Sequence, residues 1–471
     1  MPAPRITVST LSKLSIAWAV AGPIGAAGVG HSVRGVSAVM AHSGGPSGMV
    51  ATTTHATIRR MNAIIFVGGG HAAAQVCASL VEAGLGAQVQ LVCAEPELPY
   101  QRPPLSKAYL KNAAEPLQAH RAEAWYAQAG ITVHRGDAAV AIDRAARQLR
   151  LQSGTVLGYS HLVLATGARA RALPGLPAGL ENVAVVRHAA DATALRAQLP
   201  GAPSLTVLGG GFIGLEVAAT ARALGLAVRV IESAPRLLAR SVSAELAAHI
   251  LATHQAAGIV FALGAQVGAA AHDGHRLHSL VVNGQPEPVD LLLLGIGAEP
   301  EVALAEAAGL AVDNGVLVDA AMHTSDPAIL AIGDVARFPV APAWAPAGTR
   351  LRLESVQNAN DQARTAALTI QGLAPVYAAL PWFWSEQGAM RLQMAGLLPA
   401  PGSAGASQHR RAGANAASFS VLHYLAERLV CVESVNAPMD HMMSRKLMEA
   451  GKHPAPALAA DPAVAWKSLL G

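Results

Sequence analysis

Residues 63–73 read AIIFVGGGHAA, a short apolar run that enters three consecutive glycines and continues into small residues. A helical pattern follows, and a second apolar run occupies residues 89–92. This order is the strand–turn–helix–strand unit in which Gly68, Gly70 and Ala73 stand at GxGxxA spacing. The first glycine permits the tight turn, the second lets the backbone approach a pyrophosphate, and the third, small residue lets the helix pack closely on the strand. We therefore predict a dinucleotide at this helix N-terminus.

A second copy of this pattern begins at residue 205. Residues 205–216 read LTVLGGGFIGLE, with Gly209, Gly211 and Gly214 at GxGxxG spacing. Glu232 closes the strand that follows the next helix. A carboxylate in that place can accept hydrogen bonds from the hydroxyls of an adenine ribose, and it repels a 2′-phosphate. The sequence therefore favours NADH over NADPH.

The two motifs together indicate more than either does alone. A single one also fits an ordinary glycine-rich turn, whereas two complete units in one chain indicate one dinucleotide held permanently and another that comes and goes. Other buried-strand runs end at glycines, and ligands in open α/β sheets bind beyond the carboxyl ends of strands. We expect Gly297, after one such run, at the second site. We expect Asp334, after another, to accept a hydrogen bond from a ribityl hydroxyl, with a helix N-cap as the alternative.

The composition narrows the choice of chemistry. A chain of 471 residues is too long for one hydrophobic core, so two or three domains are expected. No run of 18 apolar residues occurs, which argues against a spanning helix. The cysteines stand far apart without a CxxC pair, which excludes a disulfide scaffold, a zinc ribbon, a redox dithiol and an iron–sulfur centre in this chain. Any redox chemistry must therefore reside on a bound cofactor. The cysteines are Cys77, Cys93 and Cys431.

The net charge of +4 comes from the N-terminus. Residues 1–60 carry five Lys and Arg and no acid, so the rest of the chain is close to neutral, and neither nucleic acid nor an anionic membrane is indicated as a partner. This extension could be a transit peptide, and residues 14–30 could be a weak secretory core. We favour a non-core extension that precedes the true start at Met61, and a cytoplasmic protein.

Several longer segments resemble those of the NADH-dependent ferredoxin reductases of oxygenase systems, which have a glutathione-reductase-like fold. The resemblance runs from about residue 62 to near the C-terminus, and the segments RPPLSK and PWFWS are more specific than the glycine motifs. The segments that carry it are ELPYQRPPLSK (97–107), GFIGLE (211–216), TSDP (324–327), GDVA (333–336), LESVQNA (353–359) and PWFWSEQ (381–387).

The resemblance implies a set of site residues. It makes Lys107 the lysine that lies against the flavin of FAD and pairs it with Glu216. A cation there stabilises the anionic reduced flavin, and the carboxylate holds the cation in place. Trp382 and Trp384 resemble an aromatic pair at the flavin edge, where an electron carrier docks, although plain packing explains them almost as well. Further residues at FAD-lining positions are Arg102, Ala139, Arg187 and Val356.

The chain departs from the family at one position. The family has an acid at the position of Ala94 to hold the adenosine ribose of FAD, and here the acid is Glu95, one residue later. Either Glu95 reaches the ribose by a local shift, or FAD is held without that bond. We expect FAD binding to be retained.

The resemblance also divides the chain. Residues 62–172 and 299–376 form the FAD-binding domain, and residues 173–298 form the NAD-binding domain inserted between them. Residues 377–471 form an α+β domain at the interface with the partner. The predicted fold class is therefore α/β, with two Rossmann-like domains and an α+β C-terminal domain.

The implied function is that of a ferredoxin–NAD(+) reductase. Hydride passes from NADH to flavin N5, and single electrons pass on to a [2Fe–2S] ferredoxin or a rubredoxin. The alternatives are a flavin NADH oxidase and a redox-sensing, NADH-binding flavoprotein like apoptosis-inducing factor. A monomer and a homodimer are both compatible with the sequence. Basic residues of the third domain could dock an acidic carrier, although scattered solvated charges are the favoured interpretation; these are Arg391, Arg410, Arg411, Arg445 and Lys446.

Overall fold

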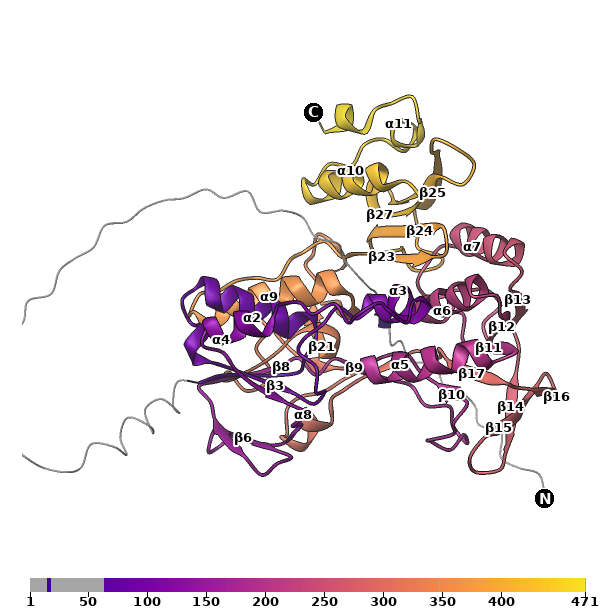
Figure 1. The fold of residues 1–471 in the computed structure, drawn as a ribbon. Coiled ribbons are helices and arrows are strands. Elements are labelled where there is room, and N and C mark those ends of the chain that lie inside the picture. Colours follow the sequence, from indigo (N-terminus) through magenta and orange to yellow (C-terminus); the bar gives the residue numbers. More distant parts are fainter. Residues whose placement is uncertain (1–14, 18–62, 347, 471) are drawn as a thin grey trace, which may run out of the picture.

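The computed structural model describes residues 15–17, 63–346 and 348–470 (Figure 1). The predicted extension and the predicted start at Met61 lie outside these residues, except for the strand β1 (Ser15–Ala17), whose backbone pairs with β22 (Arg350–Glu354). Within the described residues, no helix is both long and apolar enough to cross a membrane.

The first glycine motif lies in a five-stranded parallel sheet of order β20-β8-β2-β3-β4. Its central strand β2 is entirely buried, since a parallel strand with neighbours on both sides and covered faces is apolar throughout. Helix α2 (His71–Glu82) connects β2 to β3, as the motif predicts. The strands are β2 (Ile64–Val67), β3 (Val89–Cys93), β4 (Thr132–Arg135), β8 (His161–Leu164) and β20 (Ile329–Ala331).

Two layers cover this sheet. Helix α2 packs beside α9 (Val356–Ile370) on one face, and Figure 1 shows both above the strands. An antiparallel three-stranded sheet, β5-β6-β7, lies on the other side. Its strands are β5 (Ala139–Asp143), β6 (Gln148–Leu151) and β7 (Val156–Gly158).

The second glycine motif lies in another five-stranded parallel sheet, of order β10-β17-β11-β12-β13. Helices α5 (Ala189–Gln198) and α6 (Phe212–Ala223) cover one face, and the antiparallel sheet β14-β15-β16 covers the other (Figure 1). The strands are β10 (Val183–Ala184), β11 (Ser204–Leu208), β12 (Ala227–Glu232), β13 (Val260–Leu263), β14 (Val267–His272), β15 (Leu277–Val282), β16 (Gln285–Pro288) and β17 (Leu291–Leu294).

The chain passes between these two units twice, through a pair of short strands. Strand β9 (Ala168–Ala170) pairs antiparallel with β18 (Ala298–Pro300), so the outgoing and returning segments lie side by side. Exposed Arg169 on β9 forms ion pairs with Glu299 and Glu301. The predicted domain boundaries lie close to this pair of strands.

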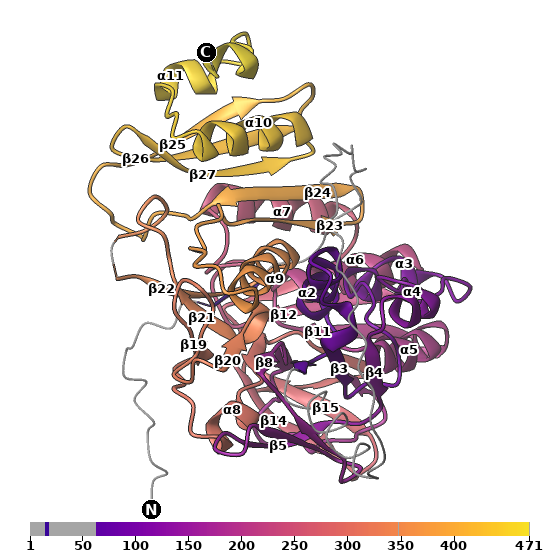
Figure 2. The same cartoon turned by 90° about the vertical axis from the view of Figure 1, so that its left-hand side faces the viewer.

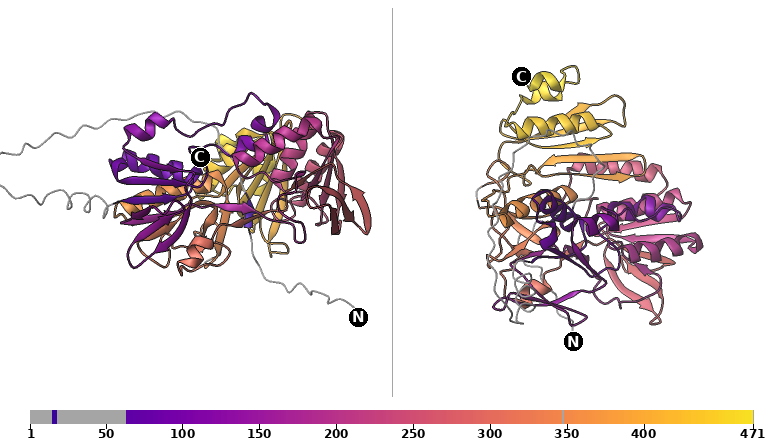
Figure 3. Two further views of the ribbon diagram at one scale, coloured as in Figure 1. Left: turned by 60° about the horizontal axis from the view of Figure 1, so that its bottom comes forward. Right: turned by 60° about the vertical axis from the view of Figure 1, so that its left-hand side comes forward.

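The third unit is an antiparallel sheet of order β23-β24-β27-β26-β25, covered by α10 and α11. It is stacked on the first two units, with β23 facing them (Figures 2 and 3). The α/β fold with two Rossmann-like units and an α+β C-terminal unit is thus confirmed. The elements are β23 (Trp382–Gln387), β24 (Met390–Gly396), β25 (Ala406–Ala412), β26 (Phe419–Leu425), β27 (Arg428–Val435), α10 (Pro438–Glu449) and α11 (Pro456–Ala460).

The remaining elements are mostly short connections. One of them, the 3-10 helix Pro103–Ser106, carries the RPPLSK segment between the first two units. The others are α3 (Ala108–Lys111), α4 (Glu123–Gln128), α7 (Ala244–Ala256), α8 (Ala303–Ala307), β19 (Val316–Leu317), β21 (Ala336–Pro339) and 3-10 turns at Gly86–Gln88, Leu199–Gly201, Gly333–Val335 and Trp466–Leu469.

Candidate dinucleotide-binding site

The glycines of the first motif serve different purposes. Gly68 has φ +128°, and a Cβ there would lie 2.2 Å from the carbonyl oxygen of Ala165, so the turn requires glycine. Gly70 is the N-cap of α2 in an extended conformation, and a Cβ there would meet only the Nε of Arg102, 4.0 Å away. The space before the helix N-terminus is therefore open. Ala73 is fully buried within the core, as expected for the small third residue.

The second motif repeats this arrangement. Gly209 has φ +106°, and a Cβ there would lie 2.4 Å from the carbonyl oxygen of Gly295. Gly211 caps α6 in an extended conformation with only ordinary contact distances around it. A Cβ on Gly214 would lie 2.6 Å from the carbonyl oxygen of Gly209, so the helix can approach its turn only with glycine there.

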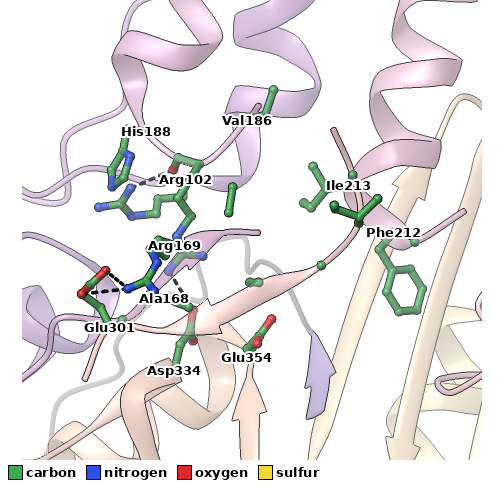
Figure 4. A pocket seen from close by; sticks show the side chains of 18 of the residues that line it. Arg102, Ala168, Arg169, Val186, His188, Phe212, Ile213, Glu301, Asp334 and Glu354 are labelled. Atoms are coloured by element: carbon green, nitrogen blue, oxygen red, sulfur yellow. Dashed lines mark hydrogen bonds and ion pairs between the residues drawn. The ribbon is translucent and has the colours of Figure 1, made fainter. Parts of the chain in front are cut away.

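Both turns open into one cavity of about 1370 Å³. It runs along the carboxyl ends of both parallel sheets, and Figure 4 shows side chains from both units around it. Four predicted residues do not line it: Ala73 and Gly214, which pack behind the turns, Lys107, and Trp382. The predicted residues that line it are Gly68, Gly70, Glu95, Arg102, Ala139, Arg187, Gly209, Gly211, Glu216, Glu232, Gly297, Asp334, Val356 and Trp384.

The Glu232 carboxylate lies against the second glycine turn. Its Oε2 accepts a hydrogen bond from the backbone N–H of Gly210 at 2.6 Å, and its Oε1 accepts one from the N–H of Ala234 at 2.7 Å. Each carboxylate oxygen has a further lone pair, so the group can still accept from ligand hydroxyls. The two backbone bonds fix the carboxylate at the edge of the cavity.

Glu95 is held by groups of the protein itself. Its Oε1 lies 2.7 Å from Nη2 of Arg102, and its Oε2 accepts a hydrogen bond from the Tyr100 hydroxyl at 2.6 Å. Burial acts to raise the pKa of Glu95, but Arg102 and the hydrogen bonds outweigh it and hold the pKa below its ordinary value. The other amino group of Arg102 donates to the carbonyl oxygen of Arg187 at 2.8 Å. Glu95 therefore positions Arg102, whereas Ala94 beside it is exposed and lines the cavity.

This arrangement predicts that substitutions at Ala94 and Glu95 change the affinity for FAD in opposite directions. Ala94→Glu is expected to bind FAD about fivefold more tightly, because it supplies one hydrogen-bond acceptor beside the cavity. Glu95→Ala is expected to weaken FAD binding by about tenfold, because it releases the charge-paired Arg102. The measurement is a fluorescence titration of the apoprotein with FAD, with Glu97→Ala as the control on the same loop. Equal affinities for the wild type and both variants would contradict this assignment.

Lys107 and Glu216 form the ion pair that the resemblance implies, with 2.6 Å between Nζ and Oε2. The Glu216 side chain is 1% exposed, while that of Lys107 is 20% exposed. Two hydroxyls also donate to the carboxylate: Ser106 Oγ to Oε2 at 2.5 Å and Ser385 Oγ to Oε1 at 2.7 Å. The donors come from the first and third units and Glu216 from the second, so all three units meet at this carboxylate.

Comparison with known proteins identifies the family. Residues 62–363 match the pyridine nucleotide-disulphide oxidoreductase family, and residues 382–470 match the reductase C-terminal family. The chain is 41% identical to rhodocoxin reductase of Rhodococcus erythropolis over 401 residues, which cover 84% of this chain and 92% of that protein. The chain belongs to the NADH-dependent ferredoxin reductase family.

Solved structures agree with this membership. The ferredoxin reductase for the CYP199A2 system of Rhodopseudomonas palustris superposes with a TM-score of 0.82 at 42% identity, covering 87% of this reductase and 100% of that chain. The covalent putidaredoxin reductase–putidaredoxin complex superposes with a TM-score of 0.80 at 36% identity, covering 87% of this reductase and 98% of that chain.

A chain of ion pairs beside the cavity links Arg187, which lies between β10 and α5 of the second unit, to the first unit. Arg187 Nη2 lies 3.0 Å from Oδ2 of Asp334, whose backbone carbonyl accepts from Arg352. Arg352 also pairs with Glu354 at 2.6 Å, and both of these side chains are buried. Burial raises the pKa of Glu354, although Arg352 acts in the opposite direction. The sequence reasoning missed Glu354, which lines the cavity (Figure 4).

The predicted aromatic pair lies at the edge of the cavity. Trp382 and Trp384 stack with ring centroids 5.5 Å apart and 21° between their planes. Trp384 lines the cavity and is 7% exposed, while Trp382 is half-buried beneath the guanidinium of Arg445, 4.2 Å from its ring centroid. The pair thus leads from the cavity toward the surface.

Arg411 is neither a docking residue for an acidic carrier nor a solvated surface charge, the two interpretations that the sequence offered. Its side chain is buried and donates hydrogen bonds to the carbonyl oxygens of Ala459, Asp461 and Val464, so it holds the C-terminal segment onto the sheet. Arg410 is more exposed, but it forms an ion pair with Glu245 on α7.

Proposed function

We propose that this reductase is an FAD-dependent NADH:ferredoxin oxidoreductase that delivers electrons to an oxygenase through a [2Fe–2S] ferredoxin or a rubredoxin. The observation that carries the proposal is that both glycine turns open into one cavity, which is also lined by Glu216, the buried partner of the Lys107 ion pair. Two dinucleotides can therefore meet end to end inside the protein. A solved relative, putidaredoxin reductase in a covalent complex with putidaredoxin, supports a small electron carrier as the partner.

FAD fits the cavity on the side of the first unit. The N-terminus of α2 supplies free N–H groups and partial positive charge for its pyrophosphate. Arg102, fixed by Glu95, and Arg187, fixed by Asp334, add two cations along the same wall. The N-terminus of α9 at Val356 also faces the cavity, so it can stabilise negative charge on the ring end of the cofactor.

NADH fits the cavity on the side of the second unit. The N-terminus of α6, beyond Gly211, is the site for its pyrophosphate. Glu232 is placed to accept hydrogen bonds from the adenine ribose and to repel a 2′-phosphate. The proposed specificity for NADH follows from this carboxylate.

The protein groups then have distinct tasks. FAD held in the cavity would supply the redox chemistry, namely acceptance of a hydride from NADH and release of single electrons. Lys107 supplies positive charge beside the reacting ring, and Glu216 holds that charge in place. Trp384 and Trp382 lead from the cavity to the face where we propose that the carrier docks. A cytoplasmic location, and a monomer or homodimer, are part of the proposal; Cys77, Cys93 and Cys431 are free and buried, as suits a reducing compartment.

The test is electron transfer to a carrier. The reductase is mixed with NADH and a purified [2Fe–2S] ferredoxin or rubredoxin, and carrier reduction is compared with peroxide formation in air without a carrier. Carrier reduction much faster than peroxide formation is the expected result. Fast peroxide formation without transfer to either carrier would favour a flavin NADH oxidase. A long-lived complex with NADH and negligible turnover would favour a redox-sensing flavoprotein.

A further inference from the structure

Strand β23 has two faces with different contacts. Side chains alternate along a strand, so Trp382 and Trp384 share one face, and Phe383, Ser385 and Gln387 share the other. The second face packs on the second unit. Phe383 contacts Phe212 on α6 with ring centroids 4.8 Å apart, which places the Ser385 hydroxyl against Glu216 on the same helix.

The Ser385 hydroxyl belongs to a buried chain of hydrogen bonds. The amide nitrogen of Gln387 donates to it at 3.2 Å, and the amide oxygen of Gln387 lies 2.8 Å from Nε2 of His254 on α7. His254, Gln387, Ser385 and Glu216 are each between 1% and 3% exposed. The chain of hydrogen bonds is therefore shielded from bulk solvent.

The chain fixes the direction in which Ser385 donates. Because the Gln387 amide occupies a lone pair of the Ser385 oxygen, the hydroxyl proton is available for Oε1 of Glu216. Among the residues that the structure describes, the backbone N–H of Glu386 also donates to that oxygen, at a longer distance of 3.4 Å. Ser385 thus donates the short hydrogen bond to Oε1 of Glu216, while Lys107 and Ser106 donate to Oε2.

We propose that Ser385 is a positioning residue: by donating to Glu216, it determines how much of the positive charge of Lys107 acts on the flavin. This inference rests on the proposed function. Lys107 is the charged side chain that contacts Glu216; the Glu386 side chain points away toward Arg391. Lys107 Nζ already lies 2.6 Å from Oε2 of Glu216, so it cannot approach further. Without the Ser385 hydroxyl, the buried carboxylate is less neutralised and offsets more of the positive charge of Lys107. The positive electrostatic potential at the reacting ring is then smaller. Strand β23, which carries both Ser385 and the aromatic pair, thereby affects the rate of hydride transfer.

The test compares Ser385→Ala with the wild type in anaerobic measurements of the flavin midpoint potential and of the rate of reduction by NADH. A hydrogen bond to a charged group corresponds to about a tenfold change in an equilibrium constant. The potential is therefore expected to fall by about 30 mV, the equivalent of tenfold for a two-electron couple. The rate is expected to fall about tenfold, and Ser385→Thr, which keeps the hydroxyl, is expected to restore both values.

The control is Ser420→Ala in the same sheet. Ser420 is also fully buried, and its hydroxyl bonds to Ser434 and Asp440 at 2.9 Å, away from Glu216. It is expected to lower the melting temperature without changing the potential. A Ser385→Ala protein with wild-type potential and rate, or a Ser420→Ala protein with the same shift, would overturn the inference alone. A wild type that NADH does not reduce would overturn the proposed function as well.

Discussion

Replacing Gly211 by glutamate is expected to leave the reductase folded and yellow while slowing its reduction by NADH about 100-fold, because like charges placed together cost several kcal/mol. The backbone at Gly211 is extended, and a Cβ there would meet only the carbonyl oxygen of Gly295, at 3.7 Å. A side chain is therefore tolerated, and it extends into the cavity. Its carboxylate would occupy the N-terminus of α6, where the pyrophosphate of NADH binds.

The measurement is stopped-flow reduction of bound FAD at saturating and limiting NADH. Gly201→Glu is the matched control, since Gly201 is exposed in the same unit, and a Cβ there would have no atom within 4 Å. The control is expected to react like the wild type. Wild-type kinetics in Gly211→Glu would show that the dinucleotide binds elsewhere.

The second large effect is expected from Lys107→Met, which should slow reduction by NADH about 100-fold and lower stability by about 3 kcal/mol. The stability loss arises because Glu216 is left as a buried carboxylate without its cation. The estimate is at the low end for a broken buried pair because Lys107 is 20% exposed. The double variant Lys107→Met/Glu216→Gln removes the unpaired charge, so it is expected to regain most of the stability but none of the rate.

Urea unfolding and stopped-flow reduction measure the two effects separately. Lys111→Met, an exposed lysine one turn further along, is the matched control and should change neither. If Lys107→Met were reduced at the wild-type rate, the lysine would have no role in the hydride step. If the double variant were less stable than Lys107→Met, the charge argument for stability would be wrong.

The parts of the fold that were predicted from the sequence depend on local patterns. The two glycine turns combine positive φ, close backbone approach and buried neighbouring strands within a dozen residues, and each of these restricts the residue type. The pairing of Lys107 with Glu216 came from the resemblance, because nothing local to either residue indicates the other. The domain boundaries and the roles of the individual site residues remain predictions.

The missed features depend on contacts between distant residues. Ser106 and Ser385 bond to Glu216 across 110 and 169 residues of sequence, and a serine in a loop or a strand carries no sign of such a partner. Arg411 looked like surface charge, but its donors satisfy carbonyl groups of the C-terminal segment. The amino-acid composition does not distinguish an arginine surrounded by water from one bonded to backbone carbonyl oxygens. The sequence left open whether Glu95 reaches the ribose, and its contacts with Arg102 and Tyr100 within the protein were not foreseen.

An anaerobic titration of the purified protein shows whether one cavity holds FAD beside NADH. The visible spectrum is recorded, and NADH and NADPH are added in separate experiments. We expect a yellow protein that is bleached by about one equivalent of NADH and far less readily by NADPH, because Glu232 repels a 2′-phosphate. A colourless protein, or a yellow one that NADH does not bleach, would contradict this expectation.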